Sequence, residues 1–292
     1  PSGTERRFYQ YMKPYTIGLY EKAMPGNLSW KEKMMAAKEA GYDFIEISID
    51  ETDEKLGRLE MSGKERLELV ALMHNTGIPI RTMCLSGHRK YPIGSSDPGI
   101  RSKGMEIMEK AILLAEDLGI RIIQLAGYDV YYEAGDAATR RLFLQNLQKA
   151  AEMASARGIM MGFETMETEF MNTVEKAMQY VEKVDLAYLN VYPDLRNITN
   201  AAATYGKDVL EDLETGKGRL VAIHLKEALP GKFREIPFGS GYVDFESGIK
   251  KAWELGVRRY VTEFWYTGSP NWKEDVDFAV RKMTDILDRQ TS

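Results

Sequence analysis

The chain has 292 residues, enough for one large α/β domain or two ordinary ones, and its apolar fraction of 44% suffices for a sizeable core. The formal net charge of -5 is modest and the Lys and Arg residues are scattered, which argues against nucleic acid as a partner. No long apolar span or signal peptide is evident, so we expect no membrane partner. The single cysteine, Cys84, cannot form an internal disulfide, which predicts a protein of the reducing cytoplasm.

One unit recurs along the chain, in which an amphipathic helix ends at a glycine and an apolar strand follows. Glycine suits this place because it adopts the left-handed conformation that ends a helix at little cost. In chain order, the candidate strands are residues 16–19, 44–49, 80–85, 120–125, 158–164, 189–192, 220–225 and 259–263. The candidate helices are residues 29–40, 63–76, 99–118, 137–157, 172–183, 205–214, 245–255 and 272–289.

Eight strands alternating with eight helices predict an α/β fold, a single (β/α)8 TIM barrel that forms a catalytic domain over residues 15–292. Residues 1–14 form a polar lead-in, which we expect to be an extension outside the barrel. The main alternative is an open, doubly wound sheet, but no Gly-x-Gly-x-x-Gly motif follows the first strand. In a barrel, the loops at the carboxyl ends of the strands form the open mouth, so the chemistry is expected there.

Four polar residues lie at the carboxyl ends of the last four candidate strands: Glu164, Asp194, His224 and Glu263. Taken singly, a buried carboxylate is more often a structural ion-pair partner than a ligand. Together, three negative charges at one edge are costly unless a cation neutralises them. The pattern therefore predicts a divalent metal site, and the ligand types leave Mn, Zn, Mg and Co open.

Two of these carboxylates also suit proton transfer. A metal that chelates the carbonyl and the neighbouring hydroxyl of a sugar would stabilise an enediolate and make the hydrogen beside the carbonyl acidic. Glu164 and Glu263 flank the other two candidate ligands in strand order, so we expect them on opposite faces of that carbon. One would remove the proton and the other would return it from the other side, which inverts the carbon.

Seven short motifs are specific together, although each is weak alone: GLYEKA (18–23), SIDETD (48–53), MCLSGHR (83–89), IQLAGYDVYY (123–132), YPD (192–194), AIHLK (222–226) and VDF (243–245). On these motifs the chain resembles the L-ribulose-5-phosphate 3-epimerases, also described as L-xylulose-5-phosphate 3-epimerases, of the xylose-isomerase-like barrel superfamily. The resemblance implies a metal, usually zinc, held by the residues that match Glu164, Asp194, His224 and Glu263. It also implies that the two glutamates are the acid/base pair and that the substrate is a phosphorylated pentulose from L-ascorbate or related pentose catabolism.

The substrate's phosphate needs a site of its own. Free-ketose epimerases of the superfamily typically carry a His three residues after the metal Asp and an Arg six after the metal His, and this chain has Asn197 and Pro230 there. A free sugar is therefore disfavoured. The tripeptide Gly239-Ser240-Gly241 could present backbone N–H groups to an anion, although turn-forming glycines explain it equally well.

Three further residues are candidates for substrate contact. His88 follows the third strand and would bind phosphate or sugar hydroxyls, or else belong to a solvated basic loop. Glu46 lies within the second strand, where it would contact substrate or pair with a buried cation. Lys226 follows the candidate metal His and could point into the mouth of the barrel.

Together with the metal site and the paired glutamates, the resemblance implies a metal-dependent 3-epimerase that interconverts L-ribulose 5-phosphate and L-xylulose 5-phosphate. The first alternative is an aldose-ketose isomerase of the hexulose-6-phosphate type on the same site. An endonuclease of abasic DNA would need more His ligands than the three His in the chain provide, and a non-catalytic sugar-binding barrel is the remaining alternative. The resemblance favours zinc, with Mn or another divalent ion left open. Exposed apolar helix faces could also support a homodimer.

Overall fold

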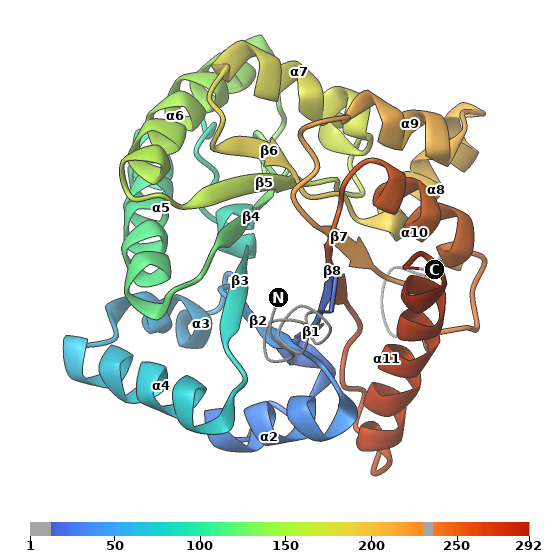
Figure 1. The fold of residues 1–292 in the computed structure, drawn as a ribbon. Helices are drawn as coiled ribbons and strands as arrows, with labels where there is room; N and C mark the ends of the chain where they lie inside the picture. The colour runs from blue at the N-terminus through green and yellow to red at the C-terminus, as the bar shows by residue number, and fades with distance from the viewer. Residues whose placement is uncertain (1–12, 230–235, 292) are drawn as a thin grey trace, which may run out of the picture.

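The computed structural model describes residues 13–229 and 236–291, and it forms a ring of helices around a curled sheet of parallel strands (Figure 1). Residues 1–12 of the predicted lead-in lie outside the described part of the chain. The strands follow the order β6-β5-β4-β3-β2-β1-β8-β7. Their bounds are β1 (Thr16–Tyr20), β2 (Phe44–Ser48), β3 (Ile80–Leu85), β4 (Ile122–Ala126), β5 (Met160–Glu164), β6 (Leu189–Val191), β7 (Ile223–Leu225) and β8 (Arg259–Thr262).

The two ends of the sheet also meet, because parallel bridges join the chain in and just after β6 to the chain in and just before β7. Val191 pairs with Leu220, and the Val191 N–H donates to the Arg219 carbonyl at 2.8 Å. A second bridge joins Asp194 to His224. The sheet therefore closes on itself, and the predicted (β/α)8 barrel is confirmed.

Helices cover the outside of the barrel, as predicted from the strand-helix alternation (Figure 1). Their bounds are α2 (Trp30–Ala40), α3 (Asp53–Gly57), α4 (Gly63–Thr76), α5 (Pro98–Leu118), α6 (Ala137–Ala156), α7 (Val174–Val184), α8 (Leu195–Tyr205), α9 (Val209–Thr215), α10 (Phe245–Glu254) and α11 (Trp272–Arg289). The predicted glycine ends are confirmed for α2, α4 and α5, since Gly41, Gly77 and Gly119 have φ values of 98°, 77° and 72°. No helix within the two described ranges is both long and apolar enough to span a membrane.

The segment between β6 and β7 differs from the sequence prediction. One helix at residues 205–214 was expected, and the structure has two, α8 and α9. Gly206 ends α8 in the left-handed conformation, with φ at 63°, and the Asp208 side chain caps α9 through the Leu210 and Glu211 N–H groups. Helix α8 begins directly after Asp194, so one of the candidate metal ligands sits at a helix N-terminus.

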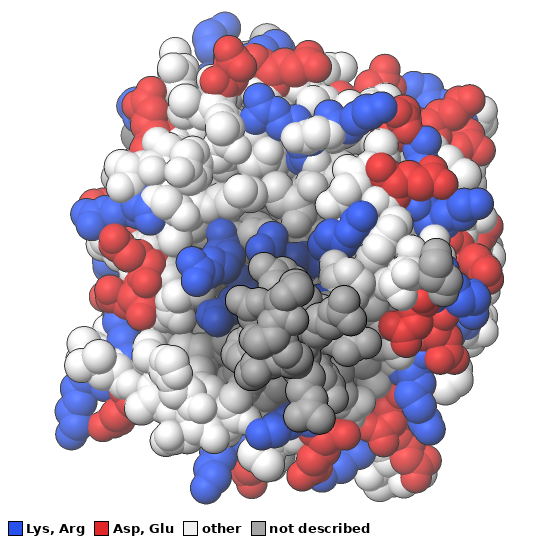
Figure 2. Space-filling model, in the orientation of Figure 1, with Lys and Arg blue, Asp and Glu red and all other residues white. Residues whose placement is uncertain are grey.

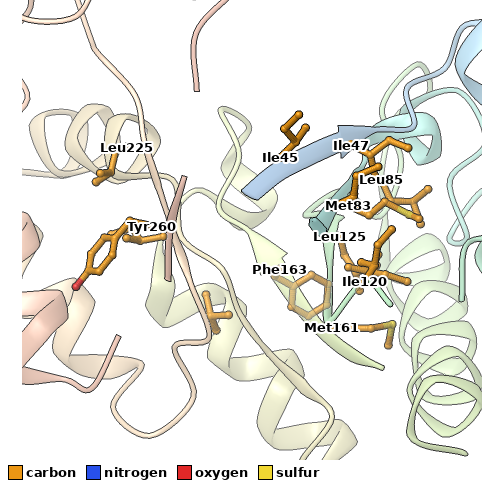
Figure 3. Close-up of a cluster of buried hydrophobic side chains, with 14 of the residues drawn as sticks. Ile45, Ile47, Met83, Leu85, Ile120, Leu125, Met161, Phe163, Leu225 and Tyr260 are labelled. Atoms are coloured by element: carbon orange, nitrogen blue, oxygen red, sulfur yellow. The ribbon is translucent and has the colours of Figure 1, made fainter. Parts of the chain in front are cut away.

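The two largest clusters of the hydrophobic core lie on either side of the strands. The larger cluster packs between the strands and the surrounding helices, and Figure 3 shows a portion of it, including Ile47, Met83, Leu125 and Phe163. A smaller cluster includes Tyr20, Phe44, Cys84, Ile122, Tyr192, Ala222 and Val261, whose strand positions alternate with those of the first set. The barrel interior is therefore packed with side chains, which leaves its carboxyl-end mouth for a site.

Candidate active site

The structure brings together the four side chains predicted as metal ligands. Glu164 is the last residue of β5, His224 lies in β7, Asp194 precedes α8 and Glu263 directly follows β8. One ligand atom from each residue lies within 4.8 Å of the others, and all four residues are at most 5% exposed. Residues separated by about a hundred positions in the chain thus share one small volume at the carboxyl ends of the strands.

Buried oxygens without donors make this cluster suitable for a cation. Asp194 Oδ2 and Glu263 Oε2 are buried and have no hydrogen-bond partner among the described residues. His224 Nδ1 lies 2.8 Å from Glu263 Oε2 and 3.8 Å from Glu164 Oε1. Leaving buried carboxylate oxygens unsatisfied is costly, so the donor set fits a divalent metal with mixed oxygen and nitrogen ligands.

Asp194 is oriented by the start of α8. Its Oδ1 accepts a hydrogen bond from the Asn197 N–H at 2.9 Å, and its own N–H donates to Thr165 Oγ1 at 2.9 Å. This N-cap bond occupies one carboxylate oxygen. The other oxygen, Oδ2, is left facing the cluster, where Lys226 Nζ lies 3.5 Å away.

The two glutamates of the cluster differ in acidity. Burial raises the pKa of Glu164 to about 7, and the His224 ring, whose Nδ1 lies 3.8 Å from Glu164 Oε1, offsets part of that effect. Burial acts on Glu263 too, but Lys226 and His224 outweigh it and hold the pKa of that carboxyl well below its ordinary value. Paired carboxyls whose surroundings separate their pKa values are typical of acid and base partners.

His224 is held from behind by a buried hydrogen-bond network. Its Nε2 lies 2.5 Å from Glu46 Oε1, while Glu46 Oε2 accepts from the Tyr192 hydroxyl at 2.8 Å and from the Thr82 hydroxyl at 2.7 Å. Gln124 Nε2 lies 3.2 Å from the other ring nitrogen, Nδ1. This arrangement favours the tautomer with the proton on Nε2 and a lone pair on Nδ1, the nitrogen that faces the cluster.

A cavity of about 550 Å³ opens above the cluster. Its walls come from the strand ends and the loops that follow them, and its lining comprises Tyr20, Lys22, Asp50, Glu51, Thr52, Cys84, Ser86, Arg89, Tyr131, Glu164, Met166, Glu167, Arg196, Asn197, Lys226, Glu263 and Trp265. Figure 2, in the same view as Figure 1, shows several Lys and Arg side chains gathered near the centre of this face. The volume suits a small polar molecule such as a sugar phosphate.

Of the candidate substrate contacts His88, Glu46, Lys226 and the Gly239–Gly241 tripeptide, Lys226 alone lines this cavity. Its Nζ is 3.0 Å from Glu263 Oε1 and lies over the Trp265 ring at 4.4 Å from the ring centre. The side chain is buried, so its charge acts directly on the carboxylates beside it. Glu46, by contrast, is fully buried behind His224 and does not line the cavity.

His88 and the glycine tripeptide lie elsewhere. His88 is buried, its Nε2 is 2.9 Å from the Gly104 carbonyl, and burial lowers its pKa to about 4. The Gly239 N–H donates to Glu227 Oε2 at 2.9 Å, and the Ser240 hydroxyl donates to the Pro237 carbonyl at 2.6 Å. A Cβ on Gly241 would lie 2.3 Å from Glu227 Oε1, so the backbone of this turn packs directly against the Glu227 side chain.

The cavity also contains residues that the sequence analysis did not select. Lys22 lies two residues beyond β1, Arg196 lies two residues beyond Asp194, and Glu167 lies three residues beyond Glu164. The sequence feature that these residues share, and by which they could have been found, is a charge within a few positions of a strand's carboxyl end. Pro230, one of the two departures from the free-ketose pattern, lies outside the described residues.

Comparison with known proteins places this barrel in a family. A family model described as the xylose isomerase-like TIM barrel matches residues 34–282. The chain belongs to this family. The resemblance to L-ribulose-5-phosphate 3-epimerases is also confirmed. The L-ribulose-5-phosphate 3-epimerase UlaE from Escherichia coli O139:H28 is 42% identical over 254 residues, which cover 87% of this chain and 88% of UlaE. SgbU from Escherichia coli K12 is 46% identical over 261 residues, covering 87% of this chain and 90% of SgbU.

Solved structures with low sequence identity share the same fold. A structure of L-ribulose 3-epimerase superposes with a TM-score of 0.77 at 18% identity, covering 95% of this chain and 96% of that one. D-Psicose 3-epimerase with D-tagatose from Clostridium cellulolyticum H10 gives a TM-score of 0.75 at 16% identity, covering 93% of this chain and 99% of that one. At such identity the comparison supports the barrel and does not extend to the substrate.

Proposed function

We propose that the chain is a metal-dependent 3-epimerase that interconverts L-ribulose 5-phosphate and L-xylulose 5-phosphate. The observation that carries the proposal is the pair of buried glutamates, Glu164 and Glu263, at the floor of a cavity of about 550 Å³. They come from β5 and from the end of β8, which lie apart in the sheet, so they can reach a bound carbon from two sides. The name of the relative UlaE supports the choice of substrate.

The metal would be held by Glu164, Asp194, His224 and Glu263, because these residues converge and two of their buried oxygens have no hydrogen-bond partner among the described residues. Zinc is the favoured ion, with Mn or another divalent ion as the alternative. When bound, a divalent cation supplies Lewis acidity toward the substrate's carbonyl, which makes the hydrogen on carbon 3 easier to remove.

The protein's own groups then move the proton. In one direction, the carboxylate of one glutamate accepts the hydrogen of carbon 3, and the carboxyl of the other donates a proton to the opposite face. Lys226, 3.0 Å from Glu263, donates hydrogen bonds and stabilises negative charge beside it. The burial of these groups excludes water and strengthens every charge interaction among them.

Product analysis distinguishes this reaction from the isomerase alternative. We expect L-ribulose 5-phosphate incubated in deuterium oxide to yield L-xylulose 5-phosphate with deuterium at carbon 3, as observed by NMR. An aldose-ketose isomerase of the hexulose-6-phosphate type would instead move the carbonyl and yield an aldose phosphate. Formation of an aldose without inversion at carbon 3 would overturn the proposal in favour of that alternative.

The setting of the reaction is proposed on the resemblance. A phosphorylated pentulose is the small-molecule partner, and L-ascorbate or related pentose catabolism in the cytoplasm is the pathway in which such a substrate arises. Neither nucleic acid nor a membrane is part of this proposal. A homodimer is the proposed assembly, and sedimentation equilibrium would measure it directly.

Glu46 provides a prediction about metal affinity. Replacing Glu46 with Gln keeps the size of the side chain but removes the charged acceptor from His224 Nε2. Because such partners orient the ring and raise its basicity, we expect metal affinity to fall on the order of 10- to 100-fold. Competition with a coloured chelator measures the affinity, and Glu152→Gln on the exposed face of α6 is the matched control. Equal affinities in all three proteins would show that Glu46 does not support the ligand.

A further inference from the structure

We propose that Arg89 and Lys22 form the phosphate subsite of the cavity, on the wall built by the residues that follow β3 and β1. This inference rests on the proposed function and names the groups that would select a phosphorylated sugar over a free one. Arg89 ends the short 3-10 helix Ser86–Arg89, and Lys22 lies in the short 3-10 helix Glu21–Ala23.

The length of the substrate separates its phosphate from the acid/base pair. In a pentulose 5-phosphate, two carbons and an ester oxygen lie between carbon 3 and the phosphorus atom. If carbon 3 lies between Glu164 and Glu263, the phosphate must bind farther up the cavity. Its partners are therefore cations that line the cavity without being committed to the metal cluster.

The described residues offer four Lys or Arg side chains along the cavity, and two of them act at the cluster. Lys226 is ion-paired with Glu263 and Asp194 at 3.0 and 3.5 Å. The charge of Arg196 acts on Asp194 and on Lys226, which places it at the same end. Lys22 and Arg89 are the two cations that remain to bind the phosphate, away from the metal cluster.

Aromatic side chains hold the Arg89 guanidinium in the cavity wall. The guanidinium lies over the Tyr131 ring, 5.0 Å from the ring centre, and 5.9 Å from the centre of the Tyr128 ring. Its Nε is buried with no hydrogen-bond partner among the described residues, while the Tyr128 side chain hydrogen-bonds to the guanidinium and the charge of Glu167 acts on it. Contacts of this kind restrict the guanidinium, whose donors can then bind two phosphate oxygens at once.

Lys22 supplies the second positive charge. Its Nζ pairs with Asp50, whose carboxylate also accepts hydrogen bonds from the Thr52 N–H and hydroxyl at 2.9 and 2.6 Å. The ammonium group has three donors, so one pairing leaves capacity for a ligand oxygen. The Thr52 and Ser86 residues complete a polar wall around the two cations.

Carboxylates on the same wall are already engaged by donors. Glu167 accepts from the Tyr128 hydroxyl at 2.6 Å, and Glu51 accepts from the Tyr132 hydroxyl at 2.9 Å. These bonds disperse part of the negative charge that would oppose a phosphate dianion. The two cations then determine which anion is accepted.

The test compares L-ribulose 5-phosphate with unphosphorylated L-ribulose, using Arg89→Met and Lys22→Met. Methionine keeps the length of each side chain and removes its charge. We expect kcat/KM for the phosphate ester to fall on the order of 10- to 100-fold in each variant, with kcat/KM for L-ribulose unchanged. Arg89→Lys, which retains a charge, should lose less than Arg89→Met. Lys90→Met, at the exposed residue beside Arg89 and outside the cavity lining, is the matched control.

Calorimetric titration with inorganic phosphate provides a readout that needs no catalysis. The wild type should bind phosphate more tightly than either methionine variant. Equal phosphate binding in all proteins, or an equal loss of kcat/KM on both sugars, would overturn the subsite. A wild type without epimerase activity would overturn the proposed function instead, while the titration would still decide whether Arg89 and Lys22 hold the anion.

Discussion

Glu164→Gln and Glu263→Gln should each abolish epimerisation, with kcat falling at least about a thousandfold, because neither amide can accept or return a proton. Each variant should nevertheless keep the proton-removal step for one of the two epimers. The glutamate that remains can still remove the carbon 3 hydrogen from one epimer, so that epimer exchanges with deuterium oxide without inversion. The two variants should therefore show exchange with opposite epimers, as measured by NMR.

Two controls separate this result from a loss of metal or fold. Metal content by elemental analysis shows whether the amide oxygen still serves as a ligand, and circular dichroism reports the fold. Glu152→Gln, on the exposed face of α6, should behave like the wild type. If both variants exchanged the same epimer, or if either retained full activity, Glu164 and Glu263 could not be opposing acid and base.

Removal of the metal should have the second large effect. Dialysis against a chelator should eliminate turnover while leaving the barrel folded, since the core packs independently of the cluster. Adding back zinc or manganese should restore activity, and the more effective ion identifies the metal. Full activity in protein that elemental analysis shows to be free of metal would contradict this prediction.

The stability of the metal-free protein should depend on pH through the same carboxyls. Burial raises the pKa of Glu164 in the folded state from 4.5 to about 7, so its stabilising contribution is present at low pH and is lost as the pH rises through about 7. The metal binds ligands in their deprotonated form. Thermal melts should therefore show a larger stabilisation by added metal at pH 8 than at pH 5.

The sequence was informative about the metal cluster because of a property of parallel sheets. Consecutive parallel strands bring their carboxyl ends to one edge, so polar residues at strand ends converge even when they are far apart in the chain. Glu164, His224 and Glu263 needed only this rule. Asp194 lies beyond the end of β6 and is positioned by the start of α8, an element that the helical pattern did not predict.

Other contacts depended on side-chain directions that a sequence pattern does not contain. Glu46 alternates into the barrel as expected, but its partner His224 lies 178 positions away in the chain. His88 and Arg89 are neighbours, yet the 3-10 turn sends His88 onto Gly104 and leaves Arg89 at the cavity. The glycine turn at Gly239 depends on Glu227, which reaches it from the end of β7.

The most direct test of the two-glutamate account follows the hydrogen at carbon 3 through a single turnover in deuterium oxide. With a separate acid and base, the new epimer should carry deuterium from the solvent at carbon 3, and the substrate that has not yet inverted should keep its protium. Transfer of the substrate's own hydrogen to carbon 3 of the product would mean that one group both removes and returns it. That result would contradict the assignment of Glu164 and Glu263 to opposite faces.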